Sequence, residues 1–107
     1  MKETYIVKQL KVVYGFAYLH KDVIADQGDK NVWIVSGVFV DRKLRGYGYG
    51  RILIDRITRD ADKESATLIL SADPNADSPL QLRALVGFYK RHGFKKVNGT
   101  MMRRTPK

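Results

Sequence analysis

The sequence predicts an α/β (α+β) protein with a central, mixed but mostly antiparallel sheet. Three observations carry this prediction. β-branched and aromatic residues fill two stretches before residue 41, and apolar residues recur at helical spacing after residue 50 and again after residue 80. The resulting order of strands, helix, strand, helix and strand is typical of an α/β arrangement. A chain of 107 residues without a linker-like stretch is expected to form one domain, residues 1–107.

Strands are expected over residues 4–19 (TYIVKQLKVVYGFAYL) and 32–40 (VWIVSGVFV), because β-branched and aromatic side chains favour extended backbone. Gly15 indicates either a bulge or a first stretch made of two tightly joined strands. Between the two stretches, residues 25–31 (ADQGDKN) have the Gly, Asp and Asn composition of a hairpin loop.

The first helix is expected in RILIDRITRDADKE, residues 51–64. Charged residues occupy one face of this stretch. The apolar residues at helical spacing on the other face are Leu53, Ile54, Ile57 and Ala61. This face is expected to pack on the sheet.

A second helix is expected after residue 78. Ser78 and Gln81 form an S-x-x-Q capping box, and Pro79 occupies the first helical position. The apolar residues that then recur along one side are Leu82, Leu85, Val86 and Tyr89. Gly93 is the expected end of this helix.

Two further strands complete the prediction. The apolar run TLILSA, residues 67–72, has the length of a buried strand. Residues 94–104 (FKKVNGTMMRR) are expected to return as a final strand, with Asn98-Gly99 as a turn or a bulge.

The composition excludes several classes of protein. Without cysteine there is no disulfide, no thiol nucleophile and no zinc-thiolate site, and no metal site is expected. No apolar run approaches the roughly 18–20 residues of a membrane span. The N-terminal sequence MKETYIVKQL does not have the pattern of a signal peptide, so a cytoplasmic protein with no membrane partner is expected.

The charge is unevenly distributed. The formal net charge is +9, and Asp77 is the last acidic residue. Residues 78–107 contain eight lysines and arginines and no carboxylate. Such a field attracts polyanions, namely nucleic acid, an acidic protein surface or a phosphorylated small molecule, although a solvated basic face has the same composition.

The stretch LRGYGYGR, residues 44–51, lies between an expected strand and the first helix. Glycines let backbone N–H groups converge on a ligand, and a helix N-terminus adds N–H groups and partial positive charge, so this arrangement suits phosphate. It is not a P-loop, because no Gly-Lys-Ser/Thr follows, and it does not fit G-x-G-x-x-G. The pattern that remains is R-x-x-G-x-G, formed by Arg45, Gly48 and Gly50.

This pattern resembles the acetyl-coenzyme A loop of the GCN5-related N-acetyltransferases (the GNAT family), where Arg-Gly-x-Gly-x-Gly follows a strand-ending valine after four variable residues. Val40 and residues 41–50 match it position for position. FYKRHGF, residues 88–94, resembles the second family signature, FY-x-x-x-GF, in the correct order. Small phage-encoded acetyltransferases, including an anti-CRISPR acetyltransferase, are loosely similar. The resemblance implies a GNAT fold that is truncated in its N-terminal helical region.

The resemblance further implies that acetyl-coenzyme A (acetyl-CoA) is the cosubstrate and that a substrate amine attacks its thioester directly. The implied donor-binding residues are Val38, Phe39, Val40, Arg45, Gly46, Tyr47, Gly48, Tyr49, Gly50 and Arg51. Tyr89 matches the position of the general acid. Residues 32–40 lack the glutamate that histone-modifying relatives place there, so Asp73 is the candidate general base, ahead of His20 and His92.

The acceptor is expected to be a primary amine. Residues 1–31 show no convincing amphipathic helix, so the acceptor site is expected to be open. An open site suits a macromolecular amine, such as a protein lysine or N-terminus, or completion by a second copy in a homodimer; a small amine is the other reading. The basic C-terminal third favours an acidic target. Two alternatives remain: a catalytically silent acyl-CoA-binding interaction module, and, less favoured, a basic nucleic-acid-binding domain.

Overall fold

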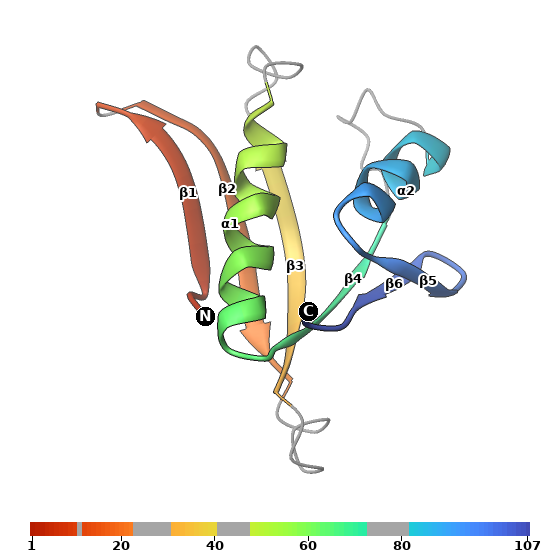
Figure 1. Ribbon diagram of the computed structural model, residues 1–107. Helices are drawn as coiled ribbons and strands as arrows, with labels where there is room; N and C mark the ends of the chain where they lie inside the picture. Colours follow the sequence, from red (N-terminus) through yellow and green to blue (C-terminus); the bar gives the residue numbers. More distant parts are fainter. Residues whose placement is uncertain (11, 23–30, 41–47, 73–81) are drawn as a thin grey trace.

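The computed structural model describes residues 1–10, 12–22, 31–40, 48–72 and 82–107, and shows a six-stranded sheet with two helices (Figure 1). The elements are β1 (Thr4–Gln9), β2 (Val12–Lys21), β3 (Val32–Val40), α1 (Tyr49–Lys63), β4 (Thr67–Ser71), α2 (Leu82–Arg91), β5 (Lys95–Asn98) and β6 (Met101–Arg104). The strand order is β1-β2-β3-β4-β6-β5, and only the β3–β4 pair is parallel. The predicted mixed, mostly antiparallel sheet is therefore confirmed.

The first predicted strand is two strands, which separate after Gln9 and not at Gly15, and the bulge expected at Gly15 lies beside it. Leu10, with φ of 55°, lies between β1 and β2, which pair antiparallel. Their register changes from Val7 opposite Gly15 to Lys8 opposite Val13, so Tyr14 is an extra residue in β2. An extra residue of this kind is a β-bulge, which bends the strand and increases its twist.

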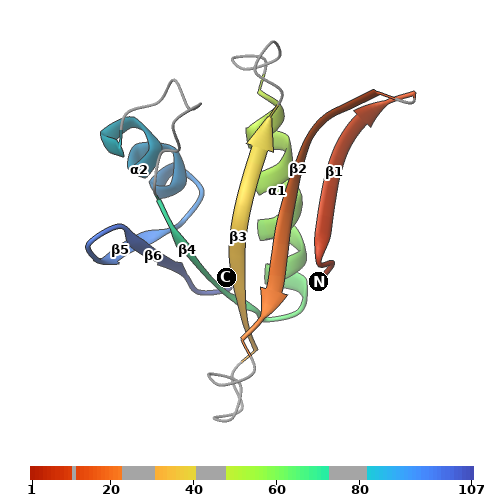
Figure 2. The ribbon, with the colours of Figure 1, turned by 180° about the vertical axis from the view of Figure 1, so that it is seen from behind.

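Helix α1 covers one face of the sheet, as the apolar spacing predicts. The side chains of Leu53, Ile54, Ile57 and Ala61 are fully buried. They pack on inward-facing residues of the first two strands, which are Tyr5, Val7, Ala17 and Leu19. Figure 2, seen from behind, shows β1, β2 and β3 with no described helix in front of them. The core therefore lies between α1 and one face of the sheet.

The C-terminal stretch differs from the expectation of one final strand. Residues 94–104 form a hairpin of two four-residue strands, β5 and β6, joined at Gly99, whose φ is 50°. The turn reading of Asn98-Gly99 is thus the correct one. Gly93, with φ of 93°, ends α2 as predicted, because glycine adopts this left-handed conformation without steric cost.

Some expectations fall outside the described residues. Most of the predicted loop at 25–31 and the capping residues Ser78, Pro79 and Gln81 lie there. Within the described part of the chain, neither helix is both long and apolar enough to cross a membrane.

Candidate functional site

The candidate site begins where β3 and β4 separate. The two strands pair only over residues 32–35 and 67–70, and β3 then continues to Val40 while β4 ends at Ser71. Figure 1 shows β4 leaning away from β3 beyond this pairing. Along residues 36–39, no described strand pairs with β3 on the β4 side. This backbone edge is therefore open to pairing with an extended ligand.

Helix α1 starts beside the end of β3. Its N-cap is Gly48, which has φ of 83° and, lacking a side chain, provides no cap hydrogen bond. The first turn closes through the Ile52 N–H and the Gly48 carbonyl at 3.1 Å, and it contains no acidic residue. A helix start without a capping oxygen or a nearby carboxylate keeps its partial positive charge for an anion.

The described residues of the glycine stretch take different positions around this helix start. Tyr49 is half-buried, and its ring centroid lies 4.9 Å from that of Tyr14. A Cβ added at Gly50 would meet Val40 Cγ2 at 3.8 Å, an ordinary contact that brings the helix start against the end of β3. Arg51 is exposed, with its Nε 3.8 Å from an Asp55 carboxylate oxygen.

Several of the predicted site residues cannot be placed. Arg45, Gly46, Tyr47 and Asp73 lie outside the described residues. Val38 is half-buried and packs against the core, whereas Phe39 is 40% exposed on the opposite face of the sheet. The structure thus brings together the end of β3 and the first turn of α1.

Tyr89 lies in α2 and is 8% exposed. Its ring makes edge-on contacts with Phe88 and Phe94, at centroid distances of 5.2 and 5.6 Å. Burial raises the pKa of Tyr89 to about 12, because the phenolate would lose its hydration. Within the described chain no residue hydrogen-bonds to its hydroxyl. Tyr89 therefore stays protonated at neutral pH and can donate to a ligand.

A carboxylate–imidazole pair joins the two helices, and sequence reasoning missed it. His92 Nδ1 lies 3.2 Å from a carboxylate oxygen of Asp55. Desolvation lowers the pKa of His92, and the cations of Arg51, Arg91 and Arg104 add to this effect, while Asp55 opposes it. The imidazole is therefore neutral at pH 7. The helical position of Asp55 carries no sequence signal for this contact.

The face of the sheet opposite α1 carries exposed apolar side chains. Because side chains alternate along a strand, the burial of Tyr5 and Ala17 beneath α1 directs their neighbours outward. Ile6 is opposite Phe16, and Phe16 is opposite Phe39 in the register. We call the four outward residues the aromatic face: Ile6, Phe16, Tyr18 and Phe39. The Phe16 ring centroid lies 5.2 Å from those of both Tyr18 and Phe39.

This order of elements and the open edge of β3 can be compared with known proteins. The profile of the acetyltransferase (GNAT) domain family matches residues 2–96. The chain belongs to this family. The sheet and the two helices match the GNAT fold, so the predicted fold and family are confirmed. No curated protein matches the sequence significantly.

Solved structures with the same fold include three proteins that this chain covers to different extents. PH1933 from Pyrococcus horikoshii matches with a TM-score of 0.75 and 23% identity, over 98% of this chain and 66% of its own. The ribosomal-protein-S18-alanine N-acetyltransferase from Escherichia coli matches with a TM-score of 0.72 and 19% identity, over 95% and 67%. The anti-CRISPR protein AcrVA5 matches with a TM-score of 0.68 and 21% identity, over 95% and 98%. The chain thus spans about two thirds of the first two and nearly all of the third.

Proposed function

We propose that this protein transfers an acetyl group from acetyl-CoA to a primary amine of a macromolecule, by direct attack of the amine in a ternary complex. The observation that carries the proposal is the separation of β3 from β4 beside an α1 start that has no side-chain cap. The open edge of β3 suits an extended pantetheine arm, and the uncapped start of α1 suits a pyrophosphate. Membership of an acetyltransferase family supports the same chemistry.

The donor would be held by backbone groups along residues 38–51. Residues 38–40 would pair with the pantetheine arm as an added strand. The N–H groups of residues 45–50 and the partial positive charge of the α1 start would hold the pyrophosphate, with Arg45 and Arg51 adding charge. Gly48 fits this role, because no atom of a described residue lies within 4 Å of the position that a Cβ would take there. Bound acetyl-CoA supplies the activated thioester, and a Phe39 or Val40 N–H would stabilise the oxyanion that develops on its carbonyl.

Tyr89 would act as the general acid. Its raised pKa of about 12 keeps the proton on the hydroxyl at neutral pH, and the hydroxyl has no described partner that competes for it. A phenol of that pKa is a weak donor in water. A thiolate that forms in a desolvated site is more basic than one in water. This narrows the difference between the pKa of Tyr89 and the pKa of the leaving thiol.

The acceptor amine must lose a proton before it attacks. For a lysine at pH 7 this deprotonation costs roughly 3.4 pKa units, or about 4.6 kcal/mol. Asp73, which follows β4 by two residues, is the proposed base, acting directly or through water. The Asp73→Asn variant is expected to have a lower rate at pH 7 and an unchanged affinity for acetyl-CoA. An unchanged pH–rate profile would remove Asp73 from this role.

A macromolecular acceptor is favoured over a small amine. Three residues of the aromatic face are exposed and Phe16 is half-buried; the face lies next to the open end of β3, and no described helix covers it. An exposed apolar cluster of this kind is typical of an interaction surface. The S18-alanine acetyltransferase, which shares the fold, is named for a protein acceptor. Seven of the eight cations in residues 78–107 are exposed and favour a target of acidic character, whereas Arg104 is buried and paired with Asp62.

The decisive experiment is mass spectrometry of cellular proteins after incubation with the purified protein and isotopically labelled acetyl-CoA. Labelled lysines or N-termini that are absent with the Tyr89→Phe variant support the proposal. A thermal-shift assay with acetyl-CoA tests donor binding separately. Absence of both labelling and stabilisation would refute the proposal.

Two other functions make distinct predictions in the same assays. A silent acyl-CoA-binding module would be stabilised by acetyl-CoA without turnover of any amine. A nucleic-acid-binding domain would bind DNA or RNA with a steep dependence on salt. Lack of affinity for both nucleic acids at low salt dismisses the second alternative.

A further inference from the structure

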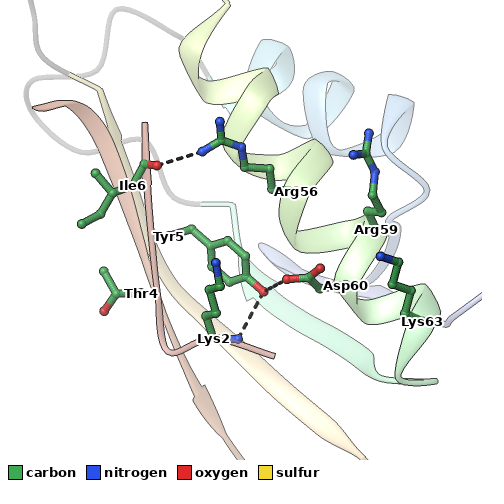
Figure 3. Close-up of a pocket in the computed structure, with 8 residues that line it drawn as sticks. All are labelled: Lys2, Thr4, Tyr5, Ile6, Arg56, Arg59, Asp60 and Lys63. Atoms are coloured by element: carbon green, nitrogen blue, oxygen red, sulfur yellow. Dashed lines mark hydrogen bonds between the residues drawn. The ribbon is translucent and has the colours of Figure 1, made fainter. Parts of the chain in front are cut away.

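A pocket of about 440 Å³ lies between β1 and α1, at the edge of the sheet (Figure 3). Its walls come from the N-terminal residues, from β1 and from the second half of α1. The residues that define its chemistry are Lys2, Tyr5, Arg56, Arg59, Asp60 and Lys63. Its volume is within the 300–1,000 Å³ range of typical small-molecule sites.

The pocket is strongly basic. Four cations and one carboxylate line it, which gives a formal charge of +3. Three of the cations follow one another along one side of α1 at positions 56, 59 and 63, a spacing that makes them neighbours. Figure 3 shows Arg59 and Lys63 emerging side by side from the helix. Like charges at this spacing repel one another unless an anion lies between them.

The carboxylate that lines the pocket, that of Asp60, is hydrogen-bonded to Tyr5. Asp60 lies four residues after Arg56 and three before Lys63, so it could pair with either cation. Instead it accepts a hydrogen bond from the Tyr5 hydroxyl at 2.6 Å. Burial and this hydrogen bond raise the pKa of Tyr5 to about 12, so the hydroxyl keeps its proton and continues to donate to Asp60. Asp60 keeps its negative charge, but this hydrogen bond holds the carboxylate against Tyr5, and it forms no ion pair with a described cation of the pocket.

The other described groups near the pocket do not form ion pairs with its cations either. Glu64, which follows Lys63, is paired with the N-terminal ammonium of Met1. Arg56 donates one hydrogen bond to the Ile6 carbonyl at 2.9 Å, and this fixes its guanidinium at the rim of the pocket. Within the described chain, Lys2, Arg59 and Lys63 form no ion pair. The pocket thus presents a net formal charge of +3, and no described carboxylate forms an ion pair with its cations.

We propose that this pocket binds a small molecule that carries two or more phosphate groups. Guanidinium groups bind phosphate through paired hydrogen bonds, and lysines add point charge. Several cations around one concave site match an anion with more than one charge. The Tyr5 ring is 4% exposed, so it offers no face for stacking a base, and recognition would rest on the phosphates. A concave site of this size favours a small anion over a nucleic-acid backbone.

The pocket is separate from the candidate donor site. Gly48 caps one end of α1, whereas Lys63 ends the helix at its other end. At 1.5 Å per residue, the two ends of this helix are about 21 Å apart. A ligand in the pocket would bridge the N-terminal segment, β1 and α1, and the stability it adds to the folded state would grow with the logarithm of its concentration above Kd.

The direct test is calorimetric titration of the full chain with tripolyphosphate at low and at physiological salt. The Arg59→Gln/Lys63→Gln double variant is expected to bind at least tenfold more weakly. Lys2→Gln, a change on another part of the chain, is expected to weaken binding as well. The matched control is Lys95→Gln/Lys96→Gln, which removes the same charge from the exposed strand β5 and is expected to stay within twofold of the wild type. Equal losses in both double variants would show a general charge effect and overturn the proposal.

Two further measurements complete the test. The Arg45→Gln/Arg51→Gln double variant of the glycine stretch is expected to bind tripolyphosphate within twofold of the wild type; a loss as large as that of Arg59→Gln/Lys63→Gln would assign the binding to the glycine stretch and overturn the proposal. A short DNA duplex is titrated in parallel. If the duplex binds through Arg59 and Lys63 and tripolyphosphate does not, the proposed ligand class is wrong. Unchanged circular dichroism and unfolding midpoints of the variants exclude loss of folding as the cause.

Discussion

Arg104 in β6 donates two hydrogen bonds to the carboxylate of Asp62 in α1, at 2.9 and 3.0 Å. The Nε of the same guanidinium donates to the His92 carbonyl at 2.9 Å. Arg104 is 3% exposed, so it is a buried cation, and its donors bond to two other parts of the chain. It links α1, the end of α2 and the C-terminal strand. Tyr89 lies one helical turn before His92, so the same link fixes the position of the proposed general acid.

The Asp62→Asn variant is expected to lower the free energy of unfolding by about 2 kcal/mol at pH 7, because it leaves a buried guanidinium without its carboxylate. Hydrogen bonding from Arg104 is the main cause that lowers the pKa of Asp62 below 3.8. A lowered folded-state pKa contributes stability above the unfolded-state pKa, and this contribution is lost as the pH falls below about 4. The difference between wild type and variant in urea unfolding should therefore shrink from pH 5 to pH 2. A constant difference would contradict this assignment.

The Tyr89→Phe variant is expected to lower the acetyl-transfer rate by about 10²-fold, the lower end of the usual effect of a general acid. Its unfolding midpoint and its affinity for acetyl-CoA should stay near the wild-type values, because the hydroxyl forms no hydrogen bond with a described residue. Steady-state kinetics and calorimetry measure these quantities. Phe94→Leu is a control that disturbs the ring packing but keeps the hydroxyl. A full rate in Tyr89→Phe would assign proton donation to another group.

Local patterns in the sequence predict most of the fold. The helical spacing of Leu53, Ile54, Ile57 and Ala61 identifies the buried face of α1, because burial decides where apolar residues lie along a helix. The hairpin in residues 94–104 is read as one strand, since two strands of four residues give only a weak alternation signal. The Asn-Gly pair contained the information needed to divide it.

The candidate site is less predictable than the fold. The glycine stretch predicts the start of α1 to within two residues, at residue 51 against the observed Tyr49, because the conformational requirement at Gly48 is local. The Arg104–Asp62 contact joins residues 42 positions apart, and only the packing of β6 against α1 brings them together. The Asp55–His92 contact and the basic pocket also arise from packing between segments that are distant in the sequence. Such contacts depend on tertiary structure, so no spacing in the sequence predicts them.

The Gly48→Ala variant is expected to be destabilised by about 1 kcal/mol, because φ of 83° is unfavourable for a residue with a Cβ even where space is free. Gly50→Ala is the matched control. It lies in the helix, where alanine is favoured over glycine by up to about 1 kcal/mol, and its Cβ would meet Val40 at an ordinary distance. Urea unfolding of both variants should give opposite signs. Equal destabilisation would show that the helix start has another backbone conformation.

The His92→Asn variant is expected to reduce the loss of stability on acidification. Desolvation lowers the pKa of His92 below 6.5, so the folded state prefers the neutral ring. Protonation then favours the unfolded state, and the wild type loses stability as the pH falls through about 6.5 toward the folded-state pKa. Urea unfolding at pH 7.5 and pH 5.5 measures this loss, with His20→Asn as the control for an exposed histidine. An equal pH dependence in wild type and His92→Asn would refute the prediction.

Gly15→Ala is expected to destabilise the protein by about 2 kcal/mol, in the range of overpacking in a core. The added Cβ would lie 2.7 Å from the Phe39 carbonyl oxygen, which belongs to the backbone, so β3 itself must shift. Because residues 38–40 are the proposed partners of the pantetheine arm, the affinity for acetyl-CoA should fall as well. Gly87→Ala in α2 is the control, since its nearest neighbour is the end of the Arg91 side chain at 3.7 Å. Thermal unfolding and calorimetry compare the two variants. A destabilised Gly15→Ala variant that binds acetyl-CoA with wild-type affinity would show that this edge of β3 does not hold the donor.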